Sequence, residues 1–358
     1  MILRRRCRTP VRALAAIAVL GGLTAAAAAC GGGGDSSASS TTPSTTAPVA
    51  VTGPGPTVGL PPTTAPAIGR RYAVGVRTDT YVDPSRPTAA VDRYAGAPDR
   101  TFPVTVWYPA TGEPGGDPVV DAAPDRSGGP YPLVLFSHGY AVTPDFYEAL
   151  LARWAAAGYV VAAPTYPLLS GEPAGPSHAD YGKVFADNRF VLGKVLADVG
   201  TTTGAHPLAG MVDPARVAAA GQSDGEVAAF GAGFLECCRD ARVKAVIAMA
   251  GNLGNINNPV QSGNGVPILH LMGEADELQP YAGAIAWDRD NLTAPRWIVT
   301  LVGGTHAPPY RDPADPHFAG VVDLTTAFLD GTLKGDATRL AAVDATATAD
   351  PARFRLER

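Results

Sequence analysis

The segment Gly221 to Gly225 reads Gly-Gln-Ser-Asp-Gly and places Ser223 between two glycines. Residues 216–218 before it are apolar and typical of a strand, and residues 227–235 after it are typical of a helix. A serine on a sharp strand-to-helix turn projects its Oγ above a sheet as a nucleophile. Glycines beside it carry no Cβ, so strand and helix can approach closely. The pattern therefore predicts Ser223 as the catalytic nucleophile.

A serine nucleophile needs a base, and histidine is suited to that role near neutral pH. His306 follows the last predicted strand in Gly303-Gly304-Thr305-His306, where the glycines allow a tight turn. We predict His306 as the base, with His317 as the alternative. His270 lies inside an apolar run and is interpreted as a core residue.

The base needs a carboxylate that fixes its tautomer. Asp276 comes three residues after Gly273, which ends an apolar strand, and it lies between Ser223 and His306 in the chain. We predict Asp276 as the acid, although Glu274 and Glu277 are close competitors. A helix N-cap is the alternative role for Asp276.

Two backbone N–H groups are expected to stabilise the developing oxyanion. One belongs to Asp224, after the nucleophile, and the other to Tyr140, in the loop that follows the apolar run 131–136. The Tyr140 ring and His138 are predicted to border the substrate, with His138 structural or positioning the oxyanion loop. Asp224 and Glu226 are expected to disfavour anionic substrates through like-charge repulsion.

Apolar runs typical of buried strands alternate with segments typical of helices. This predicts an α/β class with a mostly parallel central sheet, helices on both faces and no large lid. The predicted strands are residues 72–80, 102–108, 131–136, 159–164, 216–218, 243–250, 267–272 and 296–302.

Residues 1–69 are organised differently from the rest of the sequence. Residues 1–29 carry five arginines and then a short apolar run, as in an export signal. Residues 30–69 are rich in Gly, Ser, Thr and Pro and are predicted to be a disordered tether. We expect the catalytic domain at 70–335 and a C-terminal tail at 336–358 that packs loosely or frays.

The composition of the chain argues against nucleic-acid binding and against a metal site. The net charge of −5 gives no basic surface for nucleic acid. No Cys/His spacing indicates a metal site, and no cofactor is expected. Cys237 and Cys238 are adjacent, so either a strained vicinal disulfide or two reduced thiols is compatible with the sequence.

Residues 70–335 resemble the α/β-hydrolase superfamily. The match is carried by Tyr131 to Tyr140, Gly221 to Gly225, Gly273 to Asp276 and Gly304-Thr305-His306. The chain is similar to secreted serine esterases such as dienelactone-hydrolase-like, platelet-activating-factor-acetylhydrolase-like and cutinase-like polyester hydrolases. Cys30, after Ala27-Ala28-Ala29, resembles the lipidated cysteine of bacterial lipoproteins.

The resemblance implies a serine esterase that cleaves carboxylic esters through an acyl-enzyme, with polyesters and lipid esters as candidate substrates. A peptidase or acyltransferase on the same residues, and an inactive surface binding module, are the alternatives. We expect an exported monomer, anchored at the cell surface through Cys30 or secreted, whose partner is a small or polymeric ester.

Overall fold

The computed structural model describes residues 72–91, 94–170, 175–256, 258–293 and 295–358. The predicted signal peptide, the tether and Cys30 lie outside these ranges. In the part of the chain that is described, no helix has the length and apolar character needed to cross a membrane.

A ten-stranded sheet forms the centre of the described residues, in the order β10-β9-β8-β7-β6-β4-β5-β2-β1-β3. The pairs from β5 through β4, β6, β7 and β8 to β9 are all parallel. The pairs β1–β2, β2–β5 and β9–β10 are antiparallel. The mostly parallel sheet is therefore confirmed. The strands are β1 (Ala73–Asp83), β2 (Arg100–Ala110), β3 (Val119–Val120), β4 (Tyr131–Ser137), β5 (Val160–Pro164), β6 (Val212–Gln222), β7 (Val243–Met249), β8 (Ile268–Gly273), β9 (Arg296–Leu301) and β10 (Phe354–Glu357).

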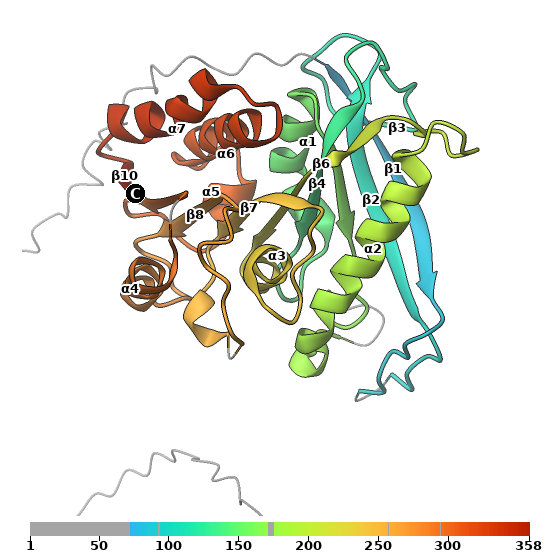
Figure 1. Cartoon of the computed structure of the whole chain (residues 1–358), viewed down its shortest axis with the longest axis horizontal. Helices are drawn as coiled ribbons and strands as arrows, with labels where there is room; N and C mark the ends of the chain where they lie inside the picture. Colours follow the sequence, from blue (N-terminus) through green and yellow to red (C-terminus); the bar gives the residue numbers. More distant parts are fainter. Residues whose placement is uncertain (1–71, 92–93, 171–174, 257, 294) are drawn as a thin grey trace, which may run out of the picture. The chain divides into compact units, whose positions relative to one another are not determined.

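Helices cover both faces of this sheet, as Figure 1 shows. On one face pack α1, α5, α6 and α7, and on the other α2, α3 and α4. The helices are α1 (Glu148–Ala156), α2 (Val184–Val199), α3 (Asp224–Phe234), α4 (Tyr281–Asn291), α5 (Pro308–Arg311), α6 (Phe318–Leu333) and α7 (Ala337–Ala349), with 3₁₀ turns η1 (Pro144–Tyr147), η2 (His178–Lys183) and η3 (Leu253–Asn255).

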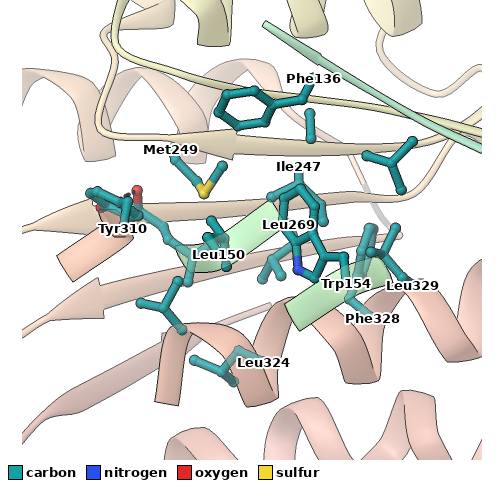
Figure 2. Packing of buried hydrophobic residues seen from close by; sticks show 14 of the residues in the cluster. Phe136, Leu150, Trp154, Ile247, Met249, Leu269, Tyr310, Leu324, Phe328 and Leu329 are labelled. Atoms are coloured by element: carbon teal, nitrogen blue, oxygen red, sulfur yellow. Dashed lines mark hydrogen bonds between the residues drawn. The ribbon is translucent and has the colours of Figure 1, made fainter. Parts of the chain in front are cut away.

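The central strands are buried on both faces because their side chains alternate between two cores. In β4, Val134 and Phe136 join the core beneath α1 and α6, whereas Leu133 and Leu135 join the core beneath α2 and α3. Figure 2 shows the first core, where Trp154 of α1 and the α6 side chains pack with the sheet residues. This double burial explains why the strands are continuously apolar in sequence.

The C-terminal residues correct one prediction. Residues 336–358 were expected to pack loosely, but they form α7 and the edge strand β10. Val343 and Ala347 of α7 are buried, and Phe354 packs against α6 at Gly320. A Cβ at Gly320 would lie 2.3 Å from the Phe354 ring, so the glycine makes room for it.

The sequence left the state of Cys237 and Cys238 open and did not predict the helix α4. Cys237 and Cys238, just beyond α3, are joined in a vicinal disulfide. The helix α4 was not predicted, because its outer face is polar and only Ala284, Ile285 and Asp288 are buried.

The loops that carry the predicted site residues lie along one edge of the sheet. The carboxyl ends of parallel strands meet along the same edge of a sheet, where such folds bind ligands. The segments after β4, β6, β8 and β9 carry Tyr140, Ser223, Asp276 and His306, respectively.

Candidate active site

Ser223 lies on a strained turn between β6 and α3. Its backbone has φ 57° and ψ −127°, a left-handed conformation that a residue with a Cβ rarely adopts. A Cβ at Gly221 would lie 2.0 Å from the Gly225 oxygen, and one at Gly225 would lie 2.0 Å from the Ser137 oxygen. Both glycines are therefore required by close backbone packing, as the sequence predicts.

The side chains of Ser223, His306 and Asp276 form a chain of hydrogen bonds, with His306 between the other two. His306 Nε2 lies 3.0 Å from Ser223 Oγ. His306 Nδ1 lies 2.8 and 3.0 Å from the two Asp276 carboxylate oxygens. The Asp276 side chain is fully buried and that of His306 is 7% exposed. In this geometry the Nδ1–H group donates a hydrogen bond to the carboxylate, so that the unprotonated Nε2 can take the proton of the serine hydroxyl.

The neighbouring carboxylates face other partners. Glu274 pairs with Arg355 at 2.6 Å on the surface. Glu277 accepts the backbone N–H of His306 at 3.1 Å. Asp276 also accepts the N–H groups of Leu278 and Gln279, which orients its carboxylate toward the His306 ring.

The other candidate histidines lie elsewhere. His317 Nε2 donates to the Val302 oxygen at 2.9 Å, which leaves it no role beside Ser223. His270 is fully buried, as the core interpretation requires, but it is paired with carboxylates.

The loop after β4 lies against the nucleophile. A Cβ on Gly139 would come within 3.1 Å of the Ser223 Cβ. The Gly139 N–H donates to the Tyr147 hydroxyl at 3.2 Å, so it is already satisfied. Among the described residues, neither the Tyr140 nor the Asp224 N–H donates to a protein acceptor. These two groups are thus available to an oxygen beside Ser223.

Gln222 and Tyr147 connect the three loops and were not singled out from the sequence. Gln222 is buried, and its Nε2 donates to the His306 carbonyl oxygen at 2.9 Å. Its Oε1 accepts the Tyr147 hydroxyl at 2.6 Å. Burial raises the pKa of Tyr147, so its hydroxyl stays protonated and can donate while accepting from Gly139. The only sequence signal was the place of Gln222 inside the Gly-x-Ser-x-Gly pattern.

The predicted substrate contact of His138 is wrong. His138 is fully buried, and its Nε2 accepts the Tyr166 N–H at 3.1 Å. Its Nδ1 therefore carries the proton and donates to the Gly139 oxygen at 2.7 Å. Burial lowers the pKa of His138 to about 4, so the ring is neutral. These contacts fit the alternative interpretation, in which His138 positions the loop.

Tyr140, His178 and Asp224 form a group beside Ser223. The rings of Tyr140 and His178 stack with centroids 3.9 Å apart and an interplanar angle of 2°. His178 Nε2 lies 3.1 Å from an Asp224 carboxylate oxygen, and the His178 side chain is 62% exposed. Burial raises the pKa of the Asp224 carboxyl, although His178 and His306 oppose that shift. His178 had no predicted role.

Glu226 corrects another expectation. Its carboxylate was expected to face the substrate with that of Asp224, but it is fully buried beneath the turn. It lies 3.3 Å from His270 Nε2 and accepts the Gly251 N–H at 2.6 Å. Any repulsion of anionic substrates is thus left to Asp224.

No metal or cofactor residues were predicted. Within the described ranges, no group of three or more His, Cys, Asp or Glu side chains is arranged to hold a metal ion.

Comparison with known proteins agrees with this geometry. Residues 103–254 match the family model described as Chlorophyllase, an esterase family of the α/β-hydrolase type. That range includes the loop with Tyr140 and the turn with Ser223. No curated protein matches the chain.

A solved structure is similar over most of the chain. The ferulic acid esterase from Streptomyces cinnamoneus aligns with a TM-score of 0.61 and 22% sequence identity, covering 84% of this chain and 99% of that one. The chain has the α/β-hydrolase fold. The predicted resemblance to this superfamily is confirmed, and the family match supports carboxylic ester hydrolase activity for this α/β-hydrolase.

The neutral, buried His138 predicts a pH dependence of stability. Its pKa falls from 6.5 to about 4 on folding, so between these values the unfolded chain binds a proton that the folded chain does not. Stability from this group is present above pH 6.5 and is lost as the pH falls below that value. From about pH 7.5 to about pH 5, the wild type should lose roughly 2 kcal/mol more unfolding free energy than His138→Gln. Urea unfolding at both pH values measures this, and equal losses in the two proteins would contradict it.

Proposed function

We propose that this α/β-hydrolase is a serine esterase that uses Ser223, His306 and Asp276 as its catalytic triad. The supporting observation is the pair of short contacts, Ser223 Oγ to His306 Nε2 at 3.0 Å and His306 Nδ1 to Asp276 at 2.8 Å. This arrangement lets the imidazole accept the serine proton as Oγ attacks an ester carbonyl.

The acylation step follows from this geometry. Ser223 Oγ bonds to the carbonyl carbon while its proton passes to His306 Nε2. The carbonyl oxygen becomes an oxyanion that accepts the N–H groups of Tyr140 and Asp224. When the carbon–oxygen bond of the ester breaks, His306 gives its proton to the departing alcohol.

Deacylation repeats these steps with water. Water attacks the acyl-enzyme and gives a proton to His306, and His306 returns it to Ser223 Oγ as the carboxylic acid leaves. Asp276 stabilises the imidazolium in both halves because its buried carboxylate stays hydrogen-bonded to Nδ1.

The group of Tyr140, His178 and Asp224 indicates the kind of ester. The side-chain carboxylate of Asp224, the residue after the nucleophile, disfavours a negative charge in the substrate. We therefore propose neutral esters as substrates, with lipid esters and polyesters among those to be assayed.

Export and lipidation at Cys30 remain predictions from the sequence.

Replacing the nucleophile should abolish activity. Ser223→Ala should lower kcat on p-nitrophenyl acetate by at least ~10³-fold, because the remaining residues cannot form an acyl-enzyme. The same variant should lose labelling by a fluorophosphonate probe. Ser127→Ala, at an exposed serine in another loop, is the matched control and should keep both properties. A Ser223→Ala protein that retains turnover would refute the assignment.

Asp224 should set the preference for neutral esters. Asp224→Asn should raise the ratio of kcat/KM for a p-nitrophenyl hemisuccinate to that for the neutral butyrate by about 5-fold, the factor expected from ~1 kcal/mol of repulsion in water. The exposed Asp290→Asn controls for net charge. An unchanged ratio in Asp224→Asn would show that the side chain does not select substrates.

A further inference from the structure

Three ionisable side chains that take no part in the proposed reaction are buried beneath the nucleophile turn. Glu226 of α3, His270 of β8 and Asp288 of α4 each have fully buried side chains. His270 Nδ1 is hydrogen-bonded to an Asp288 carboxylate oxygen, and its Nε2 lies 3.3 Å from a Glu226 oxygen. We call these three residues the buried triad.

The buried triad carries charge. Burial alone would lower the pKa of His270, but the carboxylates of Asp288 and Glu226 outweigh it and hold the pKa well above its usual value. The imidazolium is hydrogen-bonded to Asp288 through Nδ1, and its Nε2 lies within ion-pair distance of Glu226. Burying such a group is costly, and breaking it by removing one partner leaves an unpaired charge. Because the buried triad is costly in free energy and lies beneath the reacting serine, we asked how it affects the nucleophile turn.

Glu226 ties the nucleophile turn to the end of β7. Its carboxylate accepts the Gly251 N–H at 2.6 Å, two residues after Met249, whose carbonyl accepts the Ser223 N–H at 2.8 Å. The Glu226 N–H in turn donates to the Ser223 carbonyl at 2.9 Å. The turn is thus held to residues 249–251 on both sides of its strained residue.

The same short segment contacts β8, which precedes the acid, and is linked through it to α5, which follows the base. The Ala250 N–H donates to the Leu271 carbonyl, next to His270, at 2.9 Å. That carbonyl also accepts the hydroxyl of Tyr310 at 3.0 Å, from α5 just beyond His306. Figure 2 shows Met249 and Tyr310 among the buried side chains of the core.

We propose that the buried triad is a positioning network for the reaction, in which Glu226 holds the strained backbone of Ser223 in register with His306 and Asp276. A strained conformation persists only where the surroundings over-determine it. The Ser223 N–H bond to Met249 fixes one side of the turn, and Glu226 fixes the other through Gly251. His270, which is itself hydrogen-bonded to Asp288, lies 3.3 Å from the same Glu226 carboxylate.

Gly251 provides independent support. A Cβ at this position would lie 2.5 Å from the Glu226 Cδ and 2.6 Å from its Oε1. The missing side chain therefore makes the space in which the carboxylate meets the backbone N–H. Gly251→Ala should displace Glu226 without removing it.

The test measures Ser223 reactivity directly, as the second-order rate of inactivation by a fluorophosphonate probe, together with kcat and KM on p-nitrophenyl acetate. Glu226→Ala and Gly251→Ala should each lower the inactivation rate and kcat by at least ~10-fold, since small displacements of reacting groups are costly. KM should stay within ~2-fold, because the substrate contacts are unchanged. Glu226→Gln should keep the inactivation rate within ~3-fold, because its amide oxygen can still accept the Gly251 N–H.

Controls separate positioning from stability. Asp187, on α2, is also fully buried and ion-paired, with Arg100 and Arg86, but it does not contact the turn. Asp187→Asn should lower the melting temperature and leave the inactivation rate at the wild-type value. Each variant is assayed well below its own melting temperature, and Gly251→Ala serves where Glu226→Ala does not fold.

The outcomes discriminate between the two proposals. The positioning role rests on the proposed function, so the wild type must first be labelled at Ser223. A wild type that is not labelled would overturn both proposals. A labelled wild type whose folded Glu226→Ala or Gly251→Ala variants react at the wild-type rate would overturn only the positioning role. A Glu226→Gln variant as slow as Glu226→Ala would overturn the role of the Gly251 hydrogen bond.

Discussion

The strained backbone of Ser223 is the constraint around which the site is built. A non-glycine residue at φ 57° costs on the order of 1–3 kcal/mol, which the surrounding structure must offset. Gly221 and Gly225 allow the backbones to approach closely enough, and the Ser223 N–H is bonded to Met249. The result is a half-buried serine at the N-terminus of α3, next to the N–H group of Asp224.

The parallel sheet converts this local turn into a complete site. Because β4, β6, β8 and β9 run in the same direction, the loops at their carboxyl ends come together although they are far apart in sequence. Gln222 and Tyr147 then link the turn to the base and to the oxyanion loop through buried hydrogen bonds. Although the reacting groups lie on loops, their positions are fixed by backbone contacts and by buried polar hydrogen bonds.

The sequence predicted the parts of the site that depend on local pattern and chain order. Ser223 lies in a motif, and Asp276 and His306 follow strands in the order that the fold requires, so the structure brings together the residues that were expected to meet. The eight longer strands were also predicted. Burial on both faces leaves continuous apolar runs in the central strands, whereas β1 is partly exposed and is recognised by its alternating pattern.

Other features depend on tertiary partners that the sequence does not reveal. Glu226 is a charged residue next to a nucleophile, and its burial is supported by His270, on a strand two positions away from β6 in the sheet, and by the N–H group of Gly251. His138 precedes the glycine of the oxyanion loop, yet Tyr166 and Gly139 take up both ring nitrogens. The docking of the C-terminal segment depends on the space that Gly320 leaves for Phe354, which the sequence of that segment does not reveal.

The central claim is that Ser223 carries the acyl group during turnover. The most direct measurement is a rapid acid quench of the full-length enzyme turning over p-nitrophenyl acetate, followed by peptide mapping by mass spectrometry. We expect an acetyl group on Ser223, in the peptide that contains Gly221 to Gly225. Turnover with an acetyl group on a different residue, or with no acylated residue at any quench time, would contradict it.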